Sequence, residues 1–389
     1  MPRTKHLNTQ DWNMLKKTVD FFIRLTGYEL SPRSWCKVVL LTTFLLISGA
    51  ALLVFAVDPH YRYRLPFFYD TVYYQLYATA PRLLRDLNYD TLFIGSSMTR
   101  NFYLNDIDRT LGVKSIKLAA AGAATIDLKK FFDIAREAKG DALKKVVFSL
   151  DIYSLNKSEP HYKEFSYLYR DDFKEEYRYI FSRQTYGDMY YLLKRKLRPK
   201  KKRQHQADPN RMFSTEYPGM RFGIAEVVAD ARANVSSHHT QTPANPEVFE
   251  RNLENELLPM VAENPKVQFL FYLAPYHIYT WCQSEQFKEA EGLLSQRTRV
   301  MKELLKYPNV KLYDYQADRT LVCNHSFYSD VQHFGSKAAR LVLKKLASGE
   351  REIRNPAAAD ANEKELRTLI HEQMPVYYRD IQNKKEQKK

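Results

Sequence analysis

The chain has 389 residues, of which 44% are hydrophobic and 14% aromatic, a composition that excludes a disordered protein. Its formal net charge of +15 favours anionic surroundings, such as nucleic acid, lipid headgroups or an acidic polymer, but does not choose among them. The three cysteines form no CxxC pair, which excludes a zinc ribbon and a thioredoxin-type redox site.

The first predicted element is a membrane-spanning helix over residues 38–57. These 20 residues carry no charge, and at 1.5 Å rise per residue they span a hydrocarbon core of roughly 30 Å. The alternatives are a buried core helix and a cleaved signal peptide. A signal peptide has a shorter apolar region that begins nearer the N-terminus, so we expect an uncleaved anchor.

The charges around this helix predict its orientation. Residues 1–37 contain seven Lys or Arg and three Asp or Glu, which predicts a cytoplasmic N-terminal segment. Residues 58–389 then face outward, although Arg62 and Arg64 oppose this assignment. We expect a juxtamembrane connector over 58–88, a folded domain over 89–350 and a polar, solvated tail over 351–389.

The outer domain alternates predicted strands and helices, which indicates an α/β fold with a parallel sheet. The strands are expected at 91–95, 115–119, 146–151, 267–273 and 310–313, and the main helices at 127–139, 285–306 and 336–346. Residues 152–246 form a segment much longer than one crossover between strands needs, so we interpret it as an insertion or lid. The tyrosines of this insertion and its basic cluster 194–203 could bind an anionic glycan, or they belong to a helical cover with a solvated charge run.

Chemistry in such sheets collects at the carboxyl ends of the strands. The first strand runs directly into Gly95-Ser96-Ser97. A strand–turn–helix junction presents a hydroxyl beside free N–H groups, which stabilise an oxyanion. Serine at such a place is also a common helix cap. After the second strand, Gly122 allows close backbone approach and offers a second N–H, or serves packing alone.

An Asp-x-x-His pair follows the fifth strand. Asp330 and His333 precede a helix, and this spacing allows the carboxylate to hold one imidazole nitrogen while the other faces a nucleophile. The same pattern describes a helix cap beside an exposed histidine. A zinc site from His325, Asp330 and His333 is a rival interpretation.

Taken together, these blocks resemble the SGNH (GDSL) hydrolase superfamily over residues 89–348. Gly95-Ser96-Ser97 resembles its GDS block with Ser in place of Asp, Gly122 its second-block glycine, and Asp330 and His333 its terminal DxxH. The resemblance implies a flavodoxin-like three-layer α/β/α domain, with Ser97 as nucleophile.

The family's third block supplies an Asn to the oxyanion hole. Here Asp151 or Asn156 stands after the third strand, so Ser97, Gly122 and Asn156 are the expected oxyanion donors. Arg100, Asn101, Tyr276 and His277 are the expected substrate contacts.

The membrane helix and the GSS block are similar to those of extracytoplasmic SGNH proteins that partner membrane-bound O-acyltransferases, such as the DltD-like and alginate O-acetylation proteins. This resemblance implies transfer of an acetyl or similar acyl group onto an envelope polysaccharide or teichoic-acid-like polymer, without a cofactor or metal.

Other interpretations remain open. The protein is an esterase, or an inactive scaffold that binds glycan and a membrane acyltransferase, if transfer does not occur. Nucleic-acid binding is suggested by charge alone, without a binding motif, and we expect none. Cys282 and Cys323 form a disulfide in an oxidising compartment or remain two thiols.

Overall fold

The computed structural model describes Lys17, Asp20 and residues 31–170, 172–197, 207–217, 219–237 and 243–382. The chain divides into two compact units, Met1–Val57 and Asp58–Lys389, and each is described separately. Residues 198–203 of the basic cluster lie outside the described residues.

The described part of the first unit is dominated by one helix, α2 (Pro32–Val57). Its large apolar side chains are exposed along most of their length, Leu40 and Leu46 at 70% each. The most apolar window has a mean hydropathy of 2.6. The helix is therefore long and apolar enough to cross a membrane, as the sequence predicts. It begins six residues earlier than the apolar run, at Pro32, a residue suited to a first helical turn.

The second unit is built on a six-stranded sheet in the order β2-β1-β3-β4-β5-β6. The first five strands are parallel, and only β6 runs antiparallel, against β5. The strands are β1 (Thr91–Gly95), β2 (Ser115–Ala119), β3 (Lys145–Leu150), β4 (Gln268–Leu273), β5 (Val310–Asp314) and β6 (Glu352–Ile353). All five predicted strands are confirmed to within a residue.

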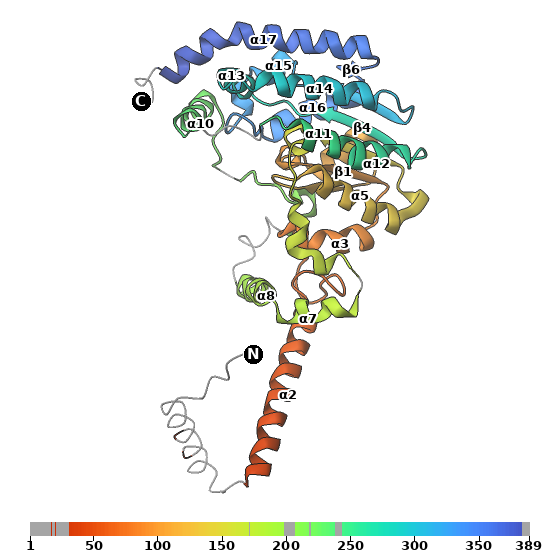
Figure 1. The fold of residues 1–389 in the computed structure, drawn as a ribbon, viewed down its shortest axis with the longest axis vertical. Coiled ribbons are helices and arrows are strands. Elements are labelled where there is room, and N and C mark those ends of the chain that lie inside the picture. The colour runs from red at the N-terminus through yellow and green to blue at the C-terminus, as the bar shows by residue number, and fades with distance from the viewer. Residues whose placement is uncertain are drawn as a thin grey trace, which may run out of the picture. The chain divides into compact units, whose positions relative to one another are not determined.

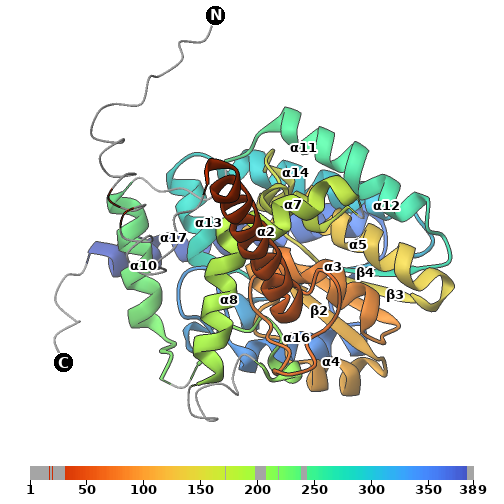
Figure 2. The ribbon, with the colours of Figure 1, turned by 90° about the horizontal axis from the view of Figure 1, so that it is seen from below.

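Helices cover both faces of the sheet. Helices α4 (Leu104–Leu111) and α16 (Ser336–Ser348) pack together on one face, and α5 (Thr125–Lys139), α12 (Leu258–Ala262) and α14 (Ala290–Leu304) lie on the other (Figure 2). Because both faces are buried, the strands are largely apolar. The mixed α/β class and the mostly parallel sheet are thus confirmed.

The strand order reverses direction between β1 and β3. From β1 the chain moves outward to β2, and from β3 it moves the other way through β4 and β5. In open α/β sheets, such a reversal at the carboxyl ends of the strands is the usual place for a functional site. Ser97 directly follows β1 and therefore lies at this place.

One predicted helix is divided. The segment expected as one helix over 285–306 consists of α13 (Ile278–Gln286) and α14, with a break between them. Lys288 adopts a left-handed conformation with φ of 62°, which interrupts the helical hydrogen bonds. The predicted helices 127–139 and 336–346 are confirmed as α5 and α16.

The insertion is largely helical and continues beyond residue 246 into one irregular helical stretch before β4. Its elements are α6 (Ile152–Leu155), η3 (His161–Leu168), α7 (Phe173–Phe181), α8 (Arg183–Lys196), η4 (Pro209–Arg211), α10 (Ile224–Ser236), α11 (Pro246–Asn252) and the π-helical turn η5 (Leu253–Leu257). The remaining short elements are η1 (Ser97–Thr99), η2 (Gly140–Ala142), α15 (Arg319–Val322) and η6 (His325–Phe327).

The connector 58–88 is a folded part of the second unit rather than a simple link. The carboxylate of Asp58 accepts the N–H groups of Arg62, Tyr63 and Arg64 at 2.7–3.1 Å. The hydroxyl of Tyr179 from α7 donates to the same carboxylate at 2.7 Å. Helix α3 (Leu76–Asp86) then packs against α5.

The expectation of a solvated tail over 351–389 is wrong for most of that segment. It contains β6 and the long helix α17 (Pro356–Gln382), which lies across α13 and α14 (Figure 1). Leu366, Leu369, Ile370 and Tyr377 recur at helical spacing and are buried. The charged residues between them cover the solvent side, which explains why the composition resembles that of a tail.

Candidate active site

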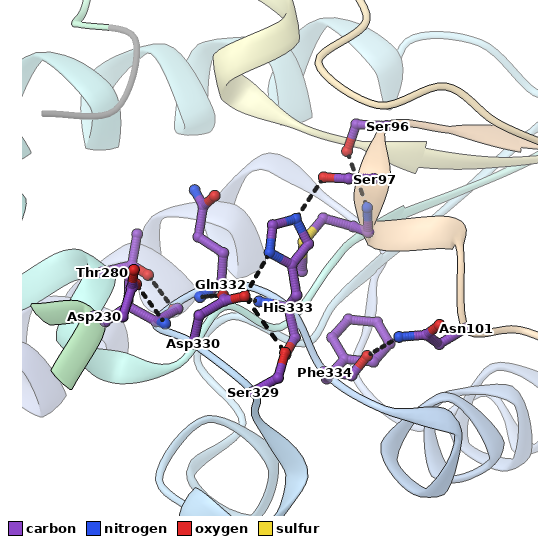
Figure 3. Close-up of polar contacts among 12 residues, drawn as sticks. Ser96, Ser97, Asn101, Asp230, Thr280, Ser329, Asp330, Gln332, His333 and Phe334 are labelled. Carbon is purple, nitrogen blue, oxygen red and sulfur yellow. Dashed lines mark hydrogen bonds and ion pairs between the residues drawn. The ribbon is translucent and has the colours of Figure 1, made fainter. Parts of the chain in front are cut away.

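The turn after β1 places two serines in different roles. Ser96 precedes η1 and its hydroxyl accepts the N–H of Met98 at 3.3 Å, so it is the cap. Ser97 directs its hydroxyl toward His333 instead (Figure 3). A Cβ on Gly95 would lie 2.4 Å from Ser149 Cβ and 2.6 Å from Thr99 Cγ2. Glycine at 95 therefore lets the turn sit tightly over β3.

The Asp-x-x-His loop completes a hydrogen-bonded series with this serine. His333 Nε2 lies 2.8 Å from Ser97 Oγ, and His333 Nδ1 lies 2.9 Å from Asp330 Oδ2. Ser97 and His333 are separated by 236 positions in sequence. Figure 3 shows the imidazole between the hydroxyl and the carboxylate. The three expected catalytic side chains are thus brought together in the order hydroxyl, imidazole, carboxylate.

Asp330 is held in its ionised form. Burial raises the pKa of its carboxyl group, but hydrogen bonds from His333 and Gln332, together with the charge of His333, outweigh burial and lower it. The second oxygen, Oδ1, accepts the backbone N–H groups of Gln332 at 2.8 Å and His333 at 2.7 Å. Both carboxylate oxygens are therefore held by hydrogen bonds, and the carboxylate orients the imidazole.

The nucleophile turn and the histidine loop are tied directly to each other. Asn101 Nδ2 donates to the carbonyl of Phe334 at 2.8 Å. The buried ammonium of Lys117 on β2 donates to the carbonyls of Arg100 and Phe102 at 2.8 and 2.6 Å. Asn101, predicted as a substrate contact, is instead 5% exposed and acts as a structural link. Lys117 was missed because its strand resembles an ordinary apolar strand.

Two backbone N–H groups are available for an oxyanion. Gly122 has φ of +65°, a conformation that favours glycine. Within the described ranges, no hydrogen-bond acceptor contacts the N–H of Ser97 or of Gly122. The two residues follow the neighbouring ends of β1 and β2, which are joined where the N–H of Ala120 donates to the carbonyl of Gly95 at 2.8 Å. This arrangement suits a two-donor oxyanion hole.

Asn156 does not provide the third donor. Its Nδ2 donates to the carbonyl of Ile152 at 3.0 Å and to Gln296 Oε1 at 2.7 Å, while its Oδ1 accepts the N–H of Asn245 at 2.6 Å. Both amide hydrogens are therefore used in folding, and the side chain is 5% exposed. This correction arises because partners from α14 and from the end of the insertion satisfy a polar group that must be buried.

Asp151 and Tyr276 also satisfy each other. The Tyr276 hydroxyl donates to Asp151 Oδ1, which also accepts the N–H of Tyr153 at 3.1 Å. Tyr276 is fully buried. The prediction that Tyr276 contacts substrate is therefore wrong, because its buried hydroxyl is hydrogen-bonded to Asp151.

His277 is buried as well. Its Nε2 lies 2.8 Å from His325 Nδ1, and its Nδ1 accepts the N–H of Tyr279 at 3.1 Å. Burial and the neighbouring His325 lower the pKa of His277 to about 3. His277 is therefore a neutral structural residue and not a substrate contact, and His325 pairs with it rather than with His333.

Arg100 is the one predicted substrate contact that is not buried, and its role stays a prediction. It is half-buried on the turn that follows Ser97, and burial lowers the pKa of its guanidinium. No ion pair to its side chain is present in the part of the chain that the structure describes.

The cysteines are not joined. Cys282 is buried, Cys323 is half-buried, and both are free thiols. Burial raises the pKa of both groups, that of Cys323 to about 11, so neither is an activated thiolate. Among the described residues, no group of three or more His, Cys, Asp or Glu side chains is arranged to hold a metal ion.

Two residues outside the predicted blocks contact the histidine loop. Asp230 of α10 and Thr280 of α13 both hydrogen-bond the peptide groups of Val331. No short motif marks either residue, and Asp230 lies within the long insertion.

The sequence matches no protein-family model and no curated protein.

Proposed function

We propose that this chain is a membrane-anchored serine acyltransferase with an SGNH-type site. The observation that carries the proposal is the series Ser97–His333–Asp330, with contacts of 2.8 and 2.9 Å at the carboxyl edge of a parallel sheet. Such a series is the arrangement in which a serine hydroxyl becomes a nucleophile.

The mechanism has two steps. His333 Nε2 takes the proton of Ser97 Oγ as that oxygen attacks an ester or thioester carbonyl, and the N–H groups of Ser97 and Gly122 receive the developing oxyanion. The leaving group departs with the proton from His333, and the acyl group stays on Ser97. A sugar hydroxyl then gives its proton to His333 as its oxygen attacks the acyl carbon, the bond to Ser97 Oγ breaks, and His333 returns the proton to Ser97 Oγ.

The proposed setting follows from the anchor and from the charge. Helix α2 suits a single membrane crossing, and the basic residues ahead of it suit an N-terminus in the cytoplasm. We place the second unit outside the cytoplasm, where an envelope polysaccharide or teichoic-acid-like polymer is the acceptor. A membrane-bound O-acyltransferase is the proposed donor of the acyl group.

Two alternatives use the same residues. Water can replace the sugar hydroxyl in the second step, so the same site supports an esterase. The engagement of Asn156 leaves the oxyanion hole with two backbone donors, a feature that favours an inactive scaffold that binds glycan. Reaction of Ser97 separates the scaffold from both enzymes, and the fate of the acyl group separates the enzymes.

The test uses the full chain in detergent micelles with a fluorophosphonate probe and with acetyl and longer-chain esters, each with and without a polysaccharide acceptor. We expect labelling that Ser97→Ala abolishes, and a loss of ester turnover of roughly 10³-fold or more. Acyl groups found on the polymer indicate a transferase, and release to water alone indicates an esterase. Wild-type turnover in Ser97→Ala contradicts the proposal.

A further inference from the structure

Helix α10 of the insertion lies against the loop that carries Asp330 and His333. The carboxylate of Asp230 accepts the N–H of Val331 through Oδ2 at 3.1 Å. The Thr280 hydroxyl from α13 donates to the carbonyl of the same residue. Figure 3 shows Asp230 and Thr280 together beside the loop. Val331 is therefore held at both of its peptide groups by side chains from two different helices.

The held residue lies at the centre of the turn that aims the imidazole. Val331 is next to Asp330, whose Oδ1 accepts the N–H groups of Gln332 and His333. Rotation of either peptide group of Val331 would move the Asp330 carboxylate away from these two donors. The position of the imidazole relative to Ser97 therefore depends on the restraint of Val331.

Helix α10 is itself anchored, so that Asp230 has a defined position. The carbonyl of Ala231 accepts Gln283 Nε2 from α13 at 3.0 Å. The guanidinium of Arg232 donates to the carbonyls of Asp380 and Ile381 at the end of α17, at 2.7 and 3.0 Å. Asp230 is thus placed by flanking contacts on both neighbouring helices rather than by the catalytic loop alone.

Asp230 also adds a second charged group whose charge interacts with those of Asp330 and His333. Burial raises the pKa of Asp230, and the nearby charge of Asp330 acts in the same direction, whereas the charge of His333 lowers it. Among the described residues, the groups around this loop include the carboxylates of Asp330 from the loop and Asp230 from α10, and the hydroxyls of Ser97 from η1 and Thr280 from α13. The carboxylate of Glu216 accepts the N–H of Ser336 just after the loop at 2.7 Å. An ionised Asp230 favours the protonated imidazole.

We propose that Asp230 is a positioning residue for the proposed reaction: it fixes Val331 and stabilises the imidazolium of His333. The inference rests on the proposed function, because positioning matters only if Ser97 reacts. It also assigns a role to the insertion, which contributes the residue that holds the histidine loop from behind.

The test compares Asp230→Ala, Asp230→Asn and Glu226→Gln with the wild-type full chain. Asp230→Ala removes the acceptor and the charge, Asp230→Asn keeps an oxygen acceptor but removes the charge, and Glu226→Gln removes a charge one turn earlier on α10. The first measurement is the rate of fluorophosphonate labelling of Ser97 against pH. In this reaction the Ser97 Oγ–P bond forms, the P–F bond breaks, fluoride leaves and the hydroxyl proton passes to His333.

The second measurement is the titration of the His333 imidazole by NMR in the same proteins, which needs no reaction at Ser97. We expect Asp230→Ala to label roughly 10- to 100-fold more slowly at the pH of maximal rate, because a small misplacement of the base is costly. Asp230→Asn should stay within about threefold of wild type there, since its oxygen still accepts the Val331 N–H. The His333 titration should move to lower pH in both, and Glu226→Gln should match wild type in both measurements.

Two results overturn the inference and leave the proposed function standing. One is wild-type labelling by Asp230→Ala with an unmoved His333 titration. The other is equal slowing by Asp230→Asn and Asp230→Ala without any change in the titration, which indicates a general packing role. If the wild type does not label but the titration moves as expected, the proposed function fails while the influence of Asp230 on the imidazole stands.

Discussion

Two segments at the carboxyl edge of the sheet each carry an aspartate, but the two carboxylates have different surroundings. Asp330 directs one oxygen to an imidazole that reaches Ser97, so its interactions lead outward to a half-exposed site. Asp151, after β3, accepts a tyrosine hydroxyl and a backbone N–H within the core. Because Asn156 beside it is also fully engaged, this second segment is closed. Polar residues at strand ends therefore indicate a site only where some of their hydrogen-bonding groups are not already used by the fold.

The largest effect expected from this contrast is at Asp330. Asp330→Asn should lower ester turnover by roughly 10³–10⁴-fold near neutral pH, because the amide no longer stabilises the imidazolium or fixes its tautomer. The measurement is kcat/KM on a small acetyl ester. Asp151→Asn is the matched control and should keep turnover while lowering thermal stability. Equal losses in the two variants contradict the division into an open and a closed segment.

The closed segment should respond in stability rather than in catalysis. Asn156→Ala removes three hydrogen bonds and leaves Gln296 and the N–H of Asn245 without this partner. We expect the free energy of unfolding to fall by about 1–3 kcal/mol, measured by denaturant titration. Ester turnover of the folded fraction should be unchanged. A selective loss of turnover would make Asn156 an oxyanion donor after all.

A third prediction concerns His277, the histidine that follows the end of β4. His277 has a pKa of about 3 in the folded chain, below its value when unfolded, so the unfolded chain binds the proton first as pH falls. Stability from neutral His277 is therefore complete above about pH 6.5 and declines toward pH 3, by about 2 kcal/mol between pH 7 and pH 5. Unfolding titrations at these pH values measure the decline.

The matched variant is His277→Asn, which keeps an acceptor for the N–H of Tyr279 at the start of α13. Its stability should depend less steeply on pH over this interval, although it loses the contact with His325. An unchanged slope would show that other groups cause the acid sensitivity.

The smallest expected effect is at Ser96, the neighbour of the nucleophile. Ser96→Ala removes the cap that accepts the Met98 N–H and should cost about 1 kcal/mol of stability. Fluorophosphonate labelling and ester turnover should remain near wild type. A complete loss of labelling in Ser96→Ala would indicate that the two serines have been assigned the wrong roles.

Sequence pattern was sufficient for the elements with strong local signals. The uncharged run 38–57 and apolar strands such as 91–95 could be predicted, because the length and the apolar pattern of each segment are local properties of the sequence. Ser97, Asp330 and His333 could be selected for a similar reason: each follows a strand, and the ends of parallel strands share one edge. The helix α17 was missed because its buried residues are spread among charges.

Tertiary structure decided which polar groups remain available. Asn101, Asn156, Tyr276 and His277 lie in the right segments but find partners that are distant in sequence, such as Phe334 for Asn101 and His325 for His277. Asp230 reaches the histidine loop only because α10 is anchored on α13 and α17. Hydrogen-bond satisfaction is a property of the folded neighbourhood, since a buried polar group must find a partner wherever the chain provides one. The sequence alone therefore determines where chemistry can gather, and packing determines which side chains are left to perform it.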